Sequence, residues 1–190
     1  TEVFKEMIEN SNENTMSTMA KLVTTTDNYT ASLIFETVIA EQYNPQENID
    51  DASSQNLALD FMDNLSNVES EMVETIYETQ TDLVNDMMTT AMSDISEEDS
   101  EAIANIISSS GNDEINEMVF NNIAASNDQS LTSGVFTNLA NTEGGSDAIM
   151  TVASTNQSLY ENMAQDMDST YMTASSLLTD TTSVYNTASA

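Results

Sequence analysis

Apolar residues recur every three or four positions over most of the chain, which is the spacing of one face of an α-helix. The clearest series occupies the middle of the first half, at Leu57, Phe61, Leu65, Val68, Met72, Ile76, Leu83 and Met87. No Gly or Pro lies between Pro45 and Gly111. The series therefore predicts one continuous amphipathic helix of roughly 30 residues.

Helical spacing also marks the N-terminal part of the chain. One apolar series runs from Val3 to Val23 and a second lies at 33–39, with the polar stretch TTTDNYT between them at 24–30. β-branched residues and Asn or Asp favour caps and turns, so this stretch predicts a break between helices. The segment 42–51 is expected to be a loop, because Pro45 disfavours helical geometry at the residue before it.

The C-terminal half contains all four Gly residues and shorter helical patterns. The predicted breaks are SSSGNDE at 108–114, SNDQS at 126–130 and NTEGGSD at 141–147. The stretch SEED at 96–99 is typical of a capping box, in which the first and last residues satisfy each other's backbone N–H groups. The last pattern extends from Tyr160 towards Leu178, and the polar tail after it is expected to be frayed or ordered only against another chain.

A six-residue motif recurs along the chain. VFNNIA at 119–124 returns as VFTNLA at 135–140, and looser copies are LYENMA at 159–164, FMDNLS at 61–66 and IFETVI at 34–39. Positions 1, 2 and 5 of each copy fall on one helical face. The Asn at position 4 is expected at the edge of that face, where its amide can reach a neighbouring helix; these residues are Asn64, Asn122, Asn138 and Asn162. The motif fits either duplicated helix-plus-turn units or unrelated short helices built from few residue types.

These patterns predict an all-α protein in which long amphipathic helices are followed by shorter helical units, packed as a bundle or an irregular α-solenoid. Residues 1–190 are expected to form a single all-helical domain, with 94–111 as the candidate sub-boundary between the two parts. Low hydrophobicity with high net charge also characterises disordered chains, so disorder is the alternative. The 13 Met residues either fill the core or line an adaptable interface.

The charge of the chain is strongly one-sided. Two Lys, no Arg and 33 acidic residues give a formal net charge of −31. Nucleic acids and anionic membrane surfaces are therefore excluded as partners, because both are bound through clusters of Lys or Arg. No apolar run approaches the roughly 20 residues that span a bilayer. Salt, or diffuse screening by Ca²⁺ and other cations, is expected to relieve the repulsion among the carboxylates.

Residue types that commonly carry catalysis are missing. The chain has no His, Cys or Arg, so it lacks the commonest general base, the thiol nucleophile and the guanidinium clamp for phosphates. Pairs of carboxylates, as used in glycoside hydrolysis, remain available. The chain has no Trp, however, and so lacks the indole rings against which sugars stack in such sites. The sequence predicts that the protein is not an enzyme and has no catalytic residue, no cofactor and no small-molecule substrate.

Two acidic clusters are candidates for a metal site, namely Asp94, Glu97, Glu98 and Asp99 in one and Asn112, Asp113 and Glu114 in the other. Carboxylate and amide oxygens suit Ca²⁺ or Mg²⁺, but neither cluster has the alternating ligands, central Gly and closing Glu of an EF-hand loop. Acidic residues are also favoured at helix N-termini, where they complement the helix dipole. This second interpretation is preferred, so no metal ligand is predicted.

The sequence thus favours a non-enzymatic structural subunit of an extracellular or cell-surface filament, sheath or lattice. Such a subunit would form homo-oligomers or polymers through apolar helix faces, and assembly would supply additional burial. Few Lys and no Arg leave little for trypsin-like proteases to cut, which fits an exterior location. The alternatives are a soluble acidic adaptor or chaperone-like module that binds a basic protein, and a segment of a larger repetitive surface protein.

Overall fold

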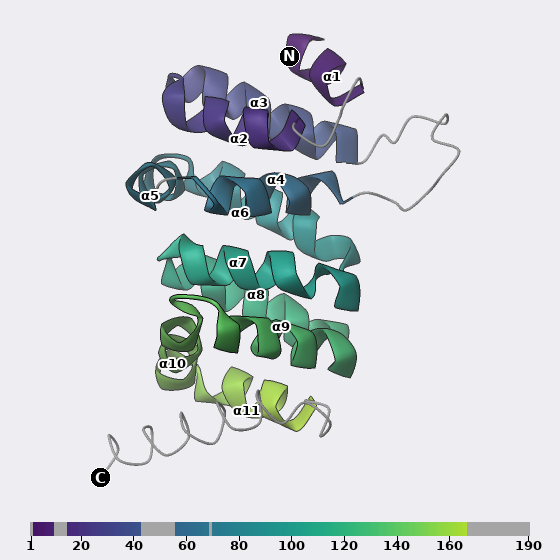
Figure 1. Ribbon diagram of the computed structural model, residues 1–190, viewed down its shortest axis with the longest axis vertical. Coiled ribbons are helices and arrows are strands. Elements are labelled where there is room, and N and C mark those ends of the chain that lie inside the picture. The colour runs from purple at the N-terminus through teal and green to yellow at the C-terminus, as the bar shows by residue number, and fades with distance from the viewer. Residues whose placement is uncertain (1, 10–14, 43–55, 69, 167–190) are drawn as a thin grey trace. The chain divides into compact units, whose positions relative to one another are not determined.

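The protein is helical wherever its structure is described. The computed structural model describes residues 2–9, 15–42, 56–68 and 70–166, and these contain helices with short connections and no strand (Figure 1). The prediction of an all-α fold is confirmed. Contacts divide the chain into two compact units, Thr1–Asp94 and Ile95–Ala190. The expected loop around Pro45, the extension towards Leu178 and the polar tail lie outside the described residues.

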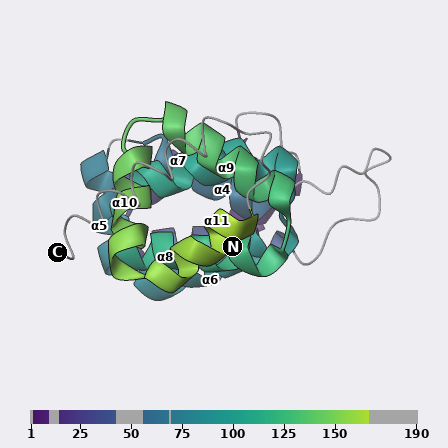
Figure 2. The same cartoon turned by 90° about the horizontal axis from the view of Figure 1, so that it is seen from below.

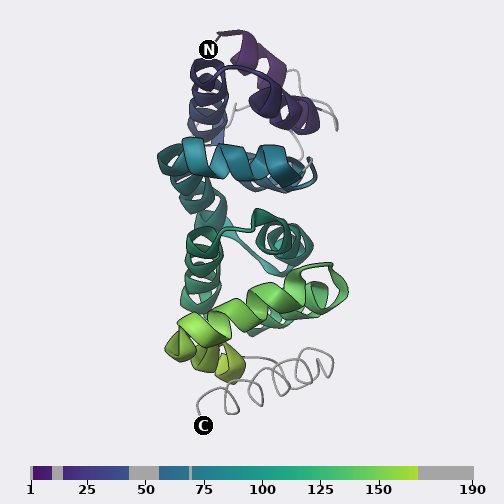
Figure 3. The same ribbon diagram turned by 90° about the vertical axis from the view of Figure 1, so that its left-hand side faces the viewer.

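Unit 1 consists of two stacked helical hairpins and one additional N-terminal helix. Its elements are α1 (Glu2–Glu9), α2 (Thr15–Thr25), α3 (Asn28–Gln42), α4 (Leu57–Ser66), α5 (Ser70–Thr79), α6 (Thr81–Ala91) and the short 3₁₀ helix η1 (Met92–Asp94). The first hairpin is α2 with α3, and the second is α4 with α6. The second stacks on the first, with α4 beside α2 and α6 beside α3 (Figure 3). Helix α5 connects α4 to α6 and contacts both.

Unit 2 also consists of two stacked hairpins. Its elements are η2 (Glu97–Asp99), α7 (Ser100–Ser110), α8 (Asp113–Ser126), α9 (Gln129–Asn141), α10 (Gly145–Thr155) and α11 (Gln157–Asp166). Helix α9 packs beside α7, and α11 packs beside α8. Figure 2 shows α7 and α9 on one side of this unit, α8 and α11 on the other, and α10 at one end.

Asn and Asp side chains cap the helices that follow most of the predicted breaks. Between α2 and α3, Asp27 Oδ1 accepts hydrogen bonds from the backbone N–H groups of Tyr29 and Thr30, both at 3.0 Å. The Thr30 hydroxyl also donates to Asp27 Oδ2 at 3.1 Å. Hydrogen bonds from the backbone and hydroxyl of Thr30 are the main reason that the pKa of Asp27 lies below its ordinary value of 3.8. Between α7 and α8, Gly111 adopts a left-handed conformation with φ 56° and Asn112 caps the next helix.

The connection between α8 and α9 follows the same chemistry, whereas α10 begins after the left-handed Gly144 without a side-chain cap. Asn127 is left-handed with φ 53°, and Asp128 Oδ1 accepts the N–H of Ser130 at 2.9 Å to start α9. The capping box is also confirmed, because the Ser96 N–H donates to Asp99 Oδ2 at 2.8 Å. Side-chain caps of this kind satisfy the backbone donors that a helix start leaves unpaired.

The predicted continuous helix over 57–87 is wrong, because this stretch forms α4, α5 and α6. After α4, the Ser66 hydroxyl and the Asn67 amide both donate to the Asp63 carbonyl, at 2.7 and 2.8 Å. Near the second break, the Thr81 hydroxyl donates to the Tyr77 carbonyl at 2.8 Å. Short polar side chains that compete for backbone carbonyls accompany both helix ends, with neither Gly nor Pro present.

The recurring motif forms much of the core. Positions 1, 2 and 5 of four copies are buried as predicted, at Ile34, Phe35, Val38, Phe61, Met62, Leu65, Val119, Phe120, Ile123, Val135, Phe136 and Leu139. The Phe35 and Phe61 rings pack edge to face at 5.3 Å between α3 and α4, and the Phe120 and Phe136 rings lie 6.1 Å apart between α8 and α9. Met19, Met62, Met87 and Met88 are fully buried, so these Met residues fill the core.

Candidate functional site

The two acidic clusters serve as helix starts in this structure. Asn112 Oδ1 accepts hydrogen bonds from the N–H groups of Glu114 and Ile115, at 3.0 and 3.1 Å. At the start of η2, Asp99 Oδ2 accepts a hydrogen bond from the backbone N–H of Ser96. Both carboxyl-rich helix starts therefore already engage backbone donors. Within the described ranges, no group of three or more acidic side chains is arranged to hold a metal ion. The side chain of Asp94 lies outside the described part.

The position-4 Asn residues behave in two ways. The Asn138 amide of α9 donates to Ser100 Oγ of α7 at 3.2 Å, so the predicted bridge between helices is confirmed there. For Asn64 and Asn122 the prediction is wrong, because each amide donates to a carbonyl four residues earlier in its own helix. The side chain of Asn162 lies outside the described residues.

The close approach of α7 and α9 explains the exception. A Cβ atom on Gly134 of α9 would lie 2.9 Å from Ser100 Cβ of α7, so the two backbones meet with almost no side chain between them. This approach brings the Ser100 hydroxyl within reach of Asn138, one turn further along α9.

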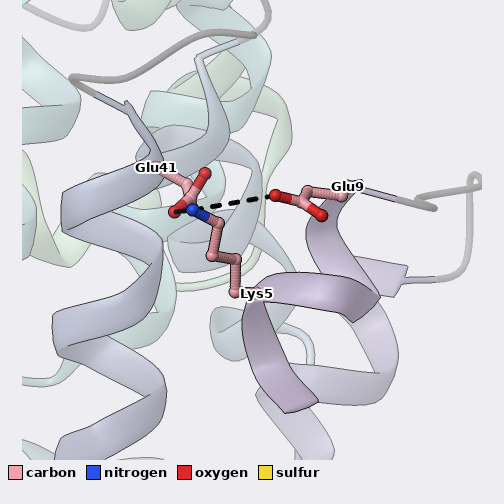
Figure 4. Close-up of polar contacts among 3 residues, drawn as sticks. All are labelled: Lys5, Glu9 and Glu41. Carbon is pink, nitrogen blue, oxygen red and sulfur yellow. Dashed lines mark ion pairs between the residues drawn. The ribbon is translucent and has the colours of Figure 1, made fainter. Parts of the chain in front are cut away.

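Glu41 is the only buried carboxylate among the acidic side chains that the structure describes. It lies in the last turn of α3 and is 8 % exposed. Lys5 of α1 places its Nζ 3.7 Å from Glu41 Oε1 and 3.7 Å from Glu9 Oε1, so the ammonium lies between the two carboxylates (Figure 4). One of the two cations of the chain therefore pairs with its one described buried carboxylate.

Two effects make the position of Glu41 unfavourable for a negative charge. A buried carboxylate is costly without a partner, and the C-terminal end of a helix is unfavourable for negative charge because the helix dipole is negative there. Lys5 offsets both effects at Glu41. The other cation, Lys21, lies exposed on α2 and has no ion pair among the described residues.

Tyr77 of α5 is a second unusual buried group. Its side chain is 1 % exposed, and its hydroxyl has no hydrogen-bond partner within the described part of the chain. Burial in apolar surroundings raises the pKa of this phenol above its ordinary value of 10.0, since the charged form is disfavoured there. The hydroxyl is buried without compensation, whereas the ring contributes packing.

We expect the Tyr77→Phe variant to keep or increase the stability of unit 1, by up to about 1 kcal/mol, because only an unpaired buried hydroxyl is removed. Urea unfolding followed by circular dichroism measures the change. Tyr29→Phe is the matched control, because Tyr29 is 72 % exposed. A clear loss of stability in Tyr77→Phe would mean that the hydroxyl makes a stabilising bond in solution.

Large apolar side chains that remain exposed are scattered over separate helices, at Val3, Tyr29, Met72 and Met150. None of the helices in the described ranges combines the length and apolarity that crossing a bilayer requires. Comparison of the chain with protein-family models, with curated proteins and with solved structures finds no match to any of them.

Proposed function

We propose that the protein is a non-enzymatic structural subunit that assembles with copies of itself into a filament, sheath or lattice at the cell exterior. The observation that supports this most directly is the stacking of hairpins in both units, where like helices lie side by side: α4 beside α2, and α9 beside α7. Stacks of this kind extend by adding one more hairpin to an open face, as helical-repeat proteins do.

Composition supports the same proposal. The chain lacks His, Cys and Arg, the residue types that most enzymes use for proton transfer, nucleophilic attack or anion stabilisation. Its Lys and Arg content of two residues makes it a poor substrate for trypsin-like proteases, which suits a protein exposed outside the cell.

Charge sets the conditions for assembly. Copies with a net charge of −31 repel one another in dilute buffer, and this repulsion extends over a Debye length of about 30 Å at 0.01 M salt and about 3 Å at 1 M. Assembly is therefore expected to strengthen as ionic strength rises.

Sedimentation velocity and light scattering between about 0.01 M and about 1 M NaCl test the proposal. We expect dispersed chains at the low end and large assemblies at the high end, with fibrous or sheet-like particles in electron micrographs. CaCl₂ at matched ionic strength separates diffuse screening, which gives the same response as NaCl, from binding of Ca²⁺ at discrete positions. Monomers at every salt concentration would rule out self-assembly.

An acidic adaptor that binds a basic protein is the second candidate, favoured by the exposed carboxylates on α3, α5, α6, α7 and α8. Its affinity would fall as salt rises, because exposed charges steer the encounter. The two proposals therefore predict opposite salt responses. The repeated helix order of the two units is also what a segment of a larger repetitive surface protein would contain, and the intact mass of the native material tests that variant.

A further inference from the structure

The two units are built to the same plan. In chain order, α2 to α6 correspond to α7 to α11: a hairpin, a third helix stacked on its first helix, a connecting helix, and a closing helix stacked on its second. Asp27 and Asn112 cap the second helix of each unit, and Asn56 and Asp128 cap the third. An aromatic pair joins the second and third helices in both units.

Helix α1 is the element of unit 1 that has no counterpart in this plan. It packs on α2 and α3, on the side of the first hairpin that faces away from α4 and α6 (Figures 1 and 3). The surface of α2 and α3 beneath it, called here the α1-covered face, is thus the outer face of a hairpin stack. Helix α1 takes the place where a stack of this kind would continue.

The attachment of α1 to this face is slight. Of its eight residues only Ile8 is buried, whereas five residues of α2 are. Val3 is 66 % exposed, and Glu2, Glu6 and Glu9 face solvent. An isolated helix this short has little stability of its own. The Lys5–Glu41 pair joins α1 to α3 across this contact.

The α1-covered face also restricts what can occupy it. Any occupant must bring a cation to Glu41, because leaving a buried carboxylate unpaired is strongly destabilising. The chain contains two Lys, and Lys5 on α1 is the one already matched to that carboxylate. A second copy of the chain carries the same helix with the same Lys. Exchange of an identical element conserves every contact of the original interface and is a low-cost route to association.

We propose that α1 of one copy docks on the α1-covered face of another copy, so that the Lys5–Glu41 ion pair forms between chains in the assembled protein. Exchange passed from each copy to the next is open-ended and generates a linear polymer, whereas reciprocal exchange closes a dimer. This inference rests on the proposed self-assembly and names the surface that performs it.

Charge-reversal variants of the full chain test the exchange. In the Lys5→Glu chain and in the Glu41→Lys chain, positions 5 and 41 carry charges of the same sign. Each variant alone is therefore expected to need at least about tenfold more protein to assemble than the wild type, which corresponds to about 1.4 kcal/mol. In an equimolar mixture, pairing between unlike chains is complementary in both directions, so the mixture is expected to assemble like the wild type.

The variants are compared at the lowest NaCl concentration at which the wild type assembles, where salt weakens the Lys5–Glu41 pair least. The pair is expected to remain effective there, because partly buried pairs are screened less than exposed ones. Lys21→Glu is the matched control for Lys5→Glu, since it changes the net charge by the same amount at an exposed Lys that has no ion pair among the described residues. It is expected to assemble almost normally. Circular dichroism and the thermal midpoint confirm that each variant is folded before mixing.

A second measurement uses the wild-type chain and does not depend on the folding of variants. Carbodiimide joins an ammonium to a nearby carboxylate, and Lys5 lies 3.7 Å from Glu41. Equal amounts of ¹⁴N and ¹⁵N chains are assembled together, crosslinked and analysed by mass spectrometry. In the assembled fraction we expect Lys5–Glu41 crosslinks that join a ¹⁴N chain to a ¹⁵N chain. In the monomer fraction we expect only crosslinks within one chain, which carry a single isotope.

The outcomes separate this inference from the proposed function. If the double variant Lys5→Glu/Glu41→Lys assembles but the mixture does not, or if all crosslinks join groups of one isotope, α1 stays on its own chain and the exchange is wrong. If the Lys5→Glu and Glu41→Lys chains each assemble like the wild type, another surface performs the assembly and the exchange is also refuted. A wild type that never assembles would overturn the proposed function, and the exchange with it.

Discussion

Replacing Phe120 by Ala is expected to lower the free energy of unfolding by about 3–5 kcal/mol, the usual cost of removing a fully buried aromatic ring. The ring has no exposed surface, lies in α8, and packs against Phe136 of α9. Its removal leaves a cavity at the place where the second hairpin of unit 2 meets the first. Interior packing is too dense for the neighbouring side chains to fill such a cavity fully.

The same plan in unit 1 makes Phe35 the equivalent of Phe120. Phe35 is also fully buried and pairs with Phe61 of α4. We therefore expect Phe35→Ala to cost a similar amount, again about 3–5 kcal/mol. Guanidinium unfolding followed by circular dichroism gives both values, and Tyr29→Ala, at an exposed aromatic, should change stability by less than about 0.5 kcal/mol. A small loss at either Phe would show that the ring pair does not hold the hairpins together.

The second large effect is expected at Gly145, the first residue of α10. A Cβ atom at this position would overlap the Leu139 carbonyl oxygen and lie 2.8 Å from the Leu139 carbonyl carbon. These are backbone atoms near the end of α9 and cannot rotate away as a side chain can. Gly145→Ala is therefore expected to cost about 3 kcal/mol, at the upper end for overpacking, through displacement of α10 from α9.

Gly111→Ala provides the comparison for Gly145→Ala. Gly111 has φ 56°, but nothing lies within 4 Å of an added Cβ. Only the left-handed backbone is strained there, at about 1–2 kcal/mol. Thermal unfolding of both variants separates the two causes. Equal losses would mean that the connection between α9 and α10 shifts enough to accept the methyl group.

The spacing of apolar residues was sufficient to predict the helices and most of their breaks. At most of these breaks an Asp or Asn satisfies free backbone N–H groups, whereas the break before α10 uses the left-handed Gly144 instead. Apolar spacing was insufficient over 57–87, where it continues through two helix ends. The residues at these ends, Ser66, Asn67 and Thr81, use their side chains on local carbonyls. Such competition depends on small differences in local bonding, and periodicity does not report it.

The Lys5–Glu41 pair could be predicted only in part. Glu41 follows Ile34 and Val38 at helical spacing, so its place on the buried stripe of α3 was visible in the sequence. Its partner depends on the packing of α1 against α3, which joins positions distant in sequence. The same limit applies to Asn138, whose bridge to Ser100 exists because Gly134 lets the two helices approach closely.

The burial of Tyr77 makes the opening of unit 1 measurable by ultraviolet absorbance. The chain has no Trp, so tyrosines dominate its near-ultraviolet absorption and emission. Tyr77 is buried in unit 1 and Tyr160 in unit 2, whereas Tyr29 is exposed. After a jump to alkaline pH, Tyr77 is therefore expected to ionise only when its surroundings open, because burial raises its pKa. The rate at which the ionised phenol of Tyr77 appears in the difference spectrum therefore measures how fast unit 1 opens, without an attached dye.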